Sequence, residues 1–128
     1  MSWYVAHVIM SVRFKDRNQD KYPVWENMIL IEASSGKEAW EQAEVRARED
    51  EGDSQGSFRW EERPAMWVFA GIRKLITCGH RGERPASGTE VSYSQFEVST
   101  EEAFQKLVNG DSVEIIYDEE PRSDGAES

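Results

Sequence analysis

Strict alternation of apolar and other residues predicts a β-strand at the start of the chain. Every second residue from Tyr4 to Phe14 is apolar, which is the period of a strand with one side in a core. The following segment, 15–22, is polar and charged, and Pro23 then opens a second apolar segment over 24–33. Two strands joined by a short polar loop predict an antiparallel hairpin.

The register of this hairpin follows from the two glutamates of its second strand. We expect Arg13 to lie opposite Val24, because a slip by one residue would bury Glu26 and Glu32. In this register the core side of the second strand consists of Trp25, Ile29 and Ile31. The other side pairs Met28 with Ile9 and Leu30 with His7.

Two S-x-x-E patterns predict the beginnings of two helices. The first begins at Ser35 and continues with apolar residues at helical spacing to about Asp50. The second begins at Ser99 and ends near Gly110. Its apolar face consists of Ala103, Phe104, Leu107 and Val108.

Three further strands are expected, over 66–78, 90–98 and 113–117. Gly71 within the first indicates a bulge or a close backbone approach. A change of apolar phase near Ser94 indicates a bulge in the second. Between the first helix and these strands, 58–60 is either a short strand or an aromatic plug.

These elements predict the α+β class. We expect a mostly antiparallel sheet of four or five strands with two helices on one face, in the order strand-strand-helix twice, then a strand. The single domain covers 1–117, and 118–128 forms a disordered acidic tail without a large apolar residue. Truncation after Tyr117 should therefore leave the melting temperature almost unchanged.

Three segments resemble a bacterial family of small acidic domains, domain of unknown function 4288. They are Trp3-Tyr4-Val5-Ala6, Glu26-Asn27-Met28-Ile29-Leu30-Ile31 leading to Ser35…Glu38-Ala39, and Phe69-Ala70-Gly71-Ile72-Arg73. The resemblance covers the chain to about Tyr117 and implies a bacterial, cytoplasmic, stand-alone protein. It implies no activity and no site residues.

Charge and cysteine content narrow the classes of function. The chain has 128 residues with 15 basic and 25 acidic side chains, a net charge of −10. Such a surface disfavours broad binding to nucleic acid or anionic membranes. No apolar run is long enough for a membrane span, and a single Cys suits a reducing cytoplasm. We expect no metal and no cofactor, because the chain has one Cys and two His.

Two places could carry chemistry. Cys78 and His80 at a strand end could be a nucleophile pair, but they lack an oriented third group, so a buried packing cysteine is the favoured interpretation. His7 could be a general base or a pH switch, and surface placement is the favoured alternative.

Basic residues gather around two loops. If the first and third strands are neighbours, they could form one positive end that binds a small anion, with solvated loops as the alternative. The candidate anion-binding residues are Arg13, Lys15, Arg73, Lys74, Arg81 and Arg84.

The sheet side away from the helices is the predicted contact surface, because it is too apolar for a solvated face. Its candidate interface residues are Trp3, Val5, His7, Ile9, Met28 and Leu30. We expect a non-enzymatic protein-interaction module or small subunit that binds itself as a homodimer or binds another protein. The alternatives are a small enzyme or anion-binding protein that uses the basic loops with His7 or His80, and an acidic antitoxin-like inhibitor that mimics nucleic acid.

Overall fold

The computed structural model describes residues 1–79 and 83–119. Four antiparallel strands form the main sheet in the order β2-β1-β4-β3. They are β1 (Ser2–Phe14), β2 (Val24–Ala33), β3 (Arg59–Trp60) and β4 (Arg63–Cys78). The remaining elements are α1 (Gly36–Glu49), β5 (Phe96–Glu97), α2 (Glu101–Val108) and β6 (Ile116–Tyr117). The α+β class and the antiparallel sheet are confirmed.

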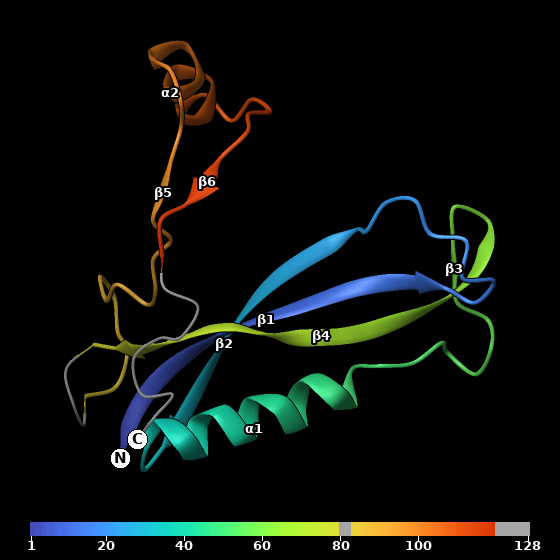
Figure 1. The fold of residues 1–128 in the computed structure, drawn as a ribbon. Helices are drawn as coiled ribbons and strands as arrows, with labels where there is room; N and C mark the ends of the chain where they lie inside the picture. The colour runs from blue at the N-terminus through green and yellow to red at the C-terminus, as the bar shows by residue number, and fades with distance from the viewer. Residues whose placement is uncertain (80–82, 120–128) are drawn as a thin grey trace.

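The core lies between one face of the sheet and α1 (Figure 1). The alternating apolar side of β1 faces this core, as its period predicted. Three alanines, Ala39, Ala43 and Ala47, are the buried contact residues of α1 together with Gly36. Such small side chains allow the helix backbone to lie close to the sheet. Larger side chains from the strands, among them Met10 and Leu75, fill the core.

The hairpin register differs from the prediction by two residues. Val24 pairs with Ser11 instead of Arg13. The reason is the side chain of Gln19, whose amide nitrogen donates to the Val12 carbonyl at 2.9 Å and whose amide oxygen accepts from the Phe14 amide at 3.0 Å. It therefore takes the place of a β2 residue at the end of the hairpin. A shift of two preserves both faces, so every residue of β2 lies on the predicted side.

Gly71 lies between two bulges in β4. The pairing with β1 shifts between His7 and Val8 and again between Ile9 and Met10. This confirms the predicted bulge. No heavy atom lies within 4 Å of the position that a Cβ at Gly71 would occupy, so no close backbone approach explains the glycine.

Segment 58–60 is both a strand and an aromatic plug. Residues Arg59–Trp60 pair with β4, while Phe58 and Trp60 pack against the small core of Val12, Phe14 and Ala65. The Trp60 ring also meets Trp25 edge-on, with the ring centroids 5.5 Å apart. This second cluster closes the end of the sheet.

Both helices begin with a side-chain cap. Ser35 is the N-cap of α1, and its hydroxyl accepts from the Glu38 amide at 3.1 Å, as predicted. In α2 the N-cap is Thr100, one residue after the predicted Ser99. The helix ends at Val108, and Gly110 follows the C-cap Asn109 with a φ of 83° and donates its amide to the Leu107 carbonyl.

Residues 96–117 form an arm that projects from the sheet on the side opposite α1 (Figure 1). The predicted strands 90–98 and 113–117 shorten to β5 and β6, which pair with each other in a separate sheet. The prediction that both helices cover one face is right for α1 and wrong for α2. Residues 90–95 contact the opposite face of the main sheet, at His7 and Lys74, and the chain therefore enters α2 on that side.

Candidate functional site

A chain of hydrogen bonds runs across the face of the sheet opposite α1, which we call the second face. His7 lies at its centre with none of its surface exposed. Its Nδ1 lies 2.7 Å from Oε2 of Glu26 on β2. Its Nε2 lies 2.5 Å from Oγ of Ser92, which belongs to the segment that crosses this face. The histidine therefore connects a carboxylate to a serine hydroxyl.

The partners of His7 determine where its ring proton lies. An ionised carboxylate only accepts hydrogen bonds, so Nδ1 carries the hydrogen. In the neutral imidazole, Nε2 is then the acceptor for the Ser92 hydroxyl. The hydroxyl of Tyr117 donates to the other oxygen of Glu26 at 3.2 Å, which holds the carboxylate in place. This is the arrangement of a nucleophile, a base and an orienting group.

A second polar cluster lies beside the first. The ammonium of Lys74 lies 2.7 Å from Glu119 and also donates to the Tyr93 carbonyl. The guanidinium of Arg73 and the amide of Gln95 donate to the same carboxylate. Burial raises the pKa of Glu119, but the hydrogen bonds from Lys74 and Gln95 outweigh it and hold the pKa below its ordinary value.

These two clusters fasten the base of the arm to the sheet. Tyr117, at the end of β6, receives the Arg73 guanidinium over its ring at 3.7 Å and reaches Glu26 with its hydroxyl. Glu119 and Tyr93 both contact Lys74. These contacts are largely polar. The apolar side chains of the arm itself do not take part in them.

The arm exposes apolar side chains along its length. Phe104 is 50% exposed, Val108 64% and Ile116 71%. No residue of α2 is buried. The second face of the sheet likewise exposes apolar residues beyond the part that 90–95 covers, namely Val24, Met28, Leu30 and Met66. Both surfaces lack a partner among the described residues of the chain.

The predicted interface residues divide into two groups. Val5 and His7 are buried within the chain, so they are not available to a partner. The segment 90–95, predicted as a strand of the sheet, instead contacts the second face and covers His7. Met28 and Leu30 are exposed at 56% and 46%, and Trp3 and Ile9 are half-buried. That this face binds a partner stays a prediction, now restricted to its uncovered part.

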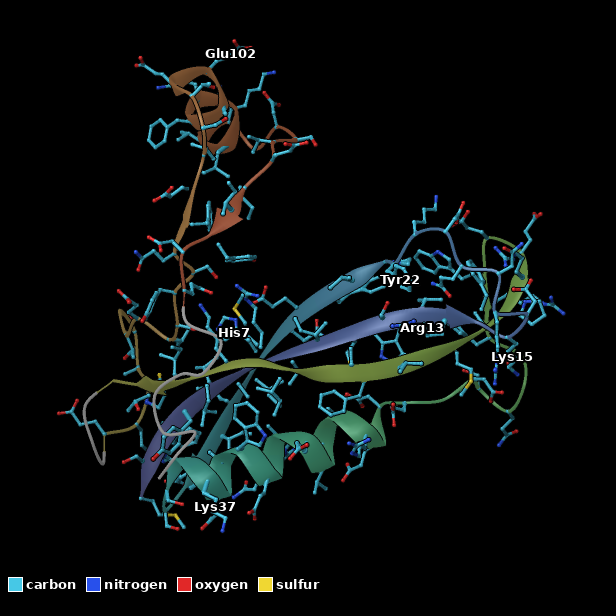
Figure 2. The ribbon with its side chains drawn as sticks, viewed as in Figure 1. His7, Arg13, Lys15, Tyr22, Lys37 and Glu102 are labelled. Atoms are coloured by element: carbon cyan, nitrogen blue, oxygen red, sulfur yellow. The ribbon has the colours of Figure 1, made fainter. Side chains whose placement is uncertain are left out.

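The candidate anion-binding residues do not gather at one end of the sheet. β1 and β4 are neighbours, but they run antiparallel, so the loop after β4 and the loop after β1 lie at opposite ends. Figure 2 shows Arg13 and Lys15 at the end away from His7. Lys15 pairs with Asp53 at 2.6 Å. Arg73 and Lys74 pair with Glu119, Arg84 is exposed, and Arg81 lies outside the described residues.

Cys78 is buried, with 1% of its surface exposed, as the packing interpretation predicted. Burial raises the pKa of its thiol, which disfavours the reactive thiolate. Its predicted companion His80 lies outside the described residues. Of the two places that the sequence suggested for chemistry, His7 is therefore the one that remains among the described residues.

Sequence reasoning identified His7 but missed Ser92 and Glu26 as its partners. Ser92 is 85 positions away in the chain, and a serine in a polar segment carries no local signal. Glu26 was treated as a solvated residue on the side of β2 away from the core. It does lie on that side, diagonal to His7, where the hydrogen bond forms.

No helix within the described residues is long and apolar enough to cross a membrane. Nor do the described residues bring together three side chains of the kinds that hold a metal ion.

Comparison with known proteins gives a family without an assigned activity. No curated protein and no solved structure matches the chain significantly. The profile of one family, described as a domain of unknown function (DUF4288), matches residues 3–93. The matched part contains β1, the hairpin, α1, β4 and Ser92, and it ends before the arm. The chain belongs to the DUF4288 family.

Proposed function

We propose that the protein is an interaction module that assembles as a homodimer, in which the arm of each copy lies on the second face of the other. The exposed apolar side of the arm carries this proposal. Phe104, Val108 and Ile116 are each at least half exposed on a segment that projects from the body. Exposed apolar patches of this kind mark interaction sites on small proteins.

The same chain supplies a matching surface. Val24 and Met28 on β2 and Met66 on β4 are exposed on the second face, and Ile9 between them is half-buried. The arm cannot reach this area on its own sheet while its base is fastened at Lys74 and Glu26, because it then points away (Figure 1). A second copy, related by a two-fold axis, supplies two identical contacts and a closed assembly.

Charge supports a second copy as the occupant. The arm, residues 96–117, has five acidic side chains and one basic side chain. The end of the hairpin that borders the uncovered part of the second face, residues 13–21, has four basic and two acidic side chains. An acidic arm and a basic loop attract each other across a two-fold interface and select its orientation.

We also place this module in the bacterial cytoplasm. The single cysteine, Cys78, is free and buried within the sheet. A free thiol and the absence of a second cysteine in the sequence suit a reducing compartment.

Sedimentation velocity over a concentration series tests the assembly. We expect the wild type to sediment as a dimer and Phe104→Glu as a folded monomer, because a charge in the interface would lose its hydration. Val45→Glu is the matched control, since Val45 is 59% exposed on α1, away from the second face. A monomeric wild type at high concentration, or equal loss of the dimer in both variants, would overturn the proposal.

A further inference from the structure

We propose that Ser92, His7 and Glu26 form an acyl-transfer site that hydrolyses small esters with an apolar acyl group. Ser92 is the nucleophile, His7 the general base and Glu26 the residue that positions His7. The proposal goes beyond assembly and concerns a separate part of the second face. It also differs from the non-enzymatic module that the sequence predicts, because the fold brings Ser92 to His7.

The geometry meets the requirements of an activated serine. The hydroxyl of Ser92 lies within hydrogen-bond distance of Nε2 of His7, at 2.5 Å, and Glu26 holds Nδ1 at 2.7 Å. With the hydrogen on Nδ1, Nε2 presents the lone pair that can take the serine proton. Residues from three separate segments, β1, β2 and the crossing segment, meet to make this arrangement.

Exposure distinguishes the roles of the three residues. His7 has no exposed surface while the Ser92 side chain lies against its Nε2. Ser92 is half-buried, so part of this residue is open to solvent.

The neighbours of Ser92 indicate the class of substrate. Val91 and Tyr93 flank it and are 43% and 51% exposed. They offer apolar surface for a short acyl chain or aromatic ring.

The reaction needs only the ester and water. Oγ of Ser92 forms a bond to the ester carbonyl carbon while its proton passes to Nε2 of His7. The carbon–oxygen bond to the alcohol breaks, and the alcohol leaves with that proton. Water then attacks the acyl-serine, gives its proton to His7, and the acid is released as the proton returns to Ser92.

A fluorophosphonate with a short alkyl chain tests the nucleophile directly, since it forms a covalent bond with activated serines. Peptide mass spectrometry identifies the labelled residue. We expect labelling at Ser92, unchanged in Ser94→Ala and abolished in Ser92→Ala. Ser94 is the matched control because it is exposed on the same segment. No labelling of Ser92 in the folded wild type, or equal labelling of both serines, would overturn the site.

A test of Glu26 as the residue that positions His7 must measure a property that a purely structural contact would not change. Glu26→Gln keeps an oxygen for Tyr117 but presents an amide that can donate to Nδ1, which moves the ring hydrogen of His7 to Nε2. We expect ¹⁵N NMR to show this change of tautomer and the labelling rate to fall by about 100-fold or more. An unchanged rate with the tautomer reversed would contradict the assignment of His7 as the base.

The dimer and the acyl-transfer site are tested by different variants, so either proposal can be refuted without the other. Ser92→Ala should sediment as the wild type does, because Ser92 lies outside the arm and the uncovered part of the second face. Phe104→Glu should keep the labelling of Ser92. Loss of the dimer in Ser92→Ala, with Ser92 unlabelled in the wild type, would show that the hydrogen bond to His7 has only a structural role.

Discussion

The carboxylate of Glu119 lies 2.7 Å from the ammonium of Lys74, and their side chains are 8% and 3% exposed. Glu119 belongs to the segment that the sequence predicts as a disordered tail, whereas Lys74 lies within β4, the longest of the described strands. Removal of one partner of such a buried pair strongly destabilises the folded protein, because the other charge stays buried without compensation. The pair therefore joins the end of the arm to the sheet.

Acid should weaken this attachment. The pKa of Glu119 is held below its ordinary value of 4.5, so the carboxylate stabilises the folded state fully above that pH. The contribution is lost as the pH falls through the lower pKa of the folded state. Glu119→Gln should cost roughly 3 kcal/mol at neutral pH and should flatten the fall in melting temperature between neutral and acid pH. Parallel melting curves for the wild type and this variant would contradict the role of the pair.

Truncation should separate the two parts of the predicted tail. Removal of residues after Tyr117 deletes Glu119 and should lower the melting temperature, contrary to the expectation from sequence. Removal of residues after Glu119 should leave it almost unchanged, since these residues include no large apolar side chain. Differential scanning calorimetry of the two truncated proteins checks both statements. Equal melting temperatures would show that Glu119 contributes nothing to the fold.

Ser35→Ala should destabilise the protein by about 1 kcal/mol. The Ser35 hydroxyl satisfies the Glu38 amide in the first turn of α1, and that helix covers the core. Ser34→Ala is the matched control, because the Ser34 hydroxyl donates to the Glu38 side chain and does not cap a backbone amide of the first turn. Urea unfolding should show no more than half the effect in the control. A larger effect at Ser34 would mean that the cap is not at Ser35.

A glycine in the turn between β3 and β4 should increase the stability of the protein. Glu61 and Glu62 have φ values of 51° and 64°, in the left-handed region that side chains other than Asn and Gly adopt at a cost. Glu62→Gly should therefore stabilise the protein by about 0.5 kcal/mol. Glu44→Gly in the middle of α1 is the control and should destabilise by about 1 kcal/mol. Destabilisation by both changes would refute the strain at Glu62.

Local patterns predicted the parts of the fold that are regular. The alternation in β1 identified the core face because a strand with one side in a core repeats every two residues. The cap at Ser35 predicted α1 because its hydrogen bond is local. The register was wrong by two because Gln19, a side chain in the loop, replaces backbone partners at Val12 and Phe14. The pattern of apolar and polar residues does not indicate that a loop side chain takes the place of backbone hydrogen-bond partners.

The arm and the candidate site depend on contacts that are distant in sequence. The apolar face of α2 predicts that this helix packs against another surface. The spacing of apolar residues does not indicate whether that surface belongs to the same chain or to another one. His7 was read as a surface residue, and its burial follows from Ser92, 85 positions later. Val5 and His7 were assigned to an open interface for the same reason. The covering segment can be located only in three dimensions.

The central claim is that the arm of one copy lies on the second face of another, and mixing two monomeric variants tests it most directly. Phe104→Glu places a charge on the contact surface of the arm and leaves the second face unchanged. Met28→Glu places a charge on the second face and leaves the arm unchanged. We predict that each variant alone sediments as a monomer and that their mixture forms a heterodimer through the one intact contact. A wild type that dimerises, with a mixture that stays monomeric at every concentration, would contradict the account.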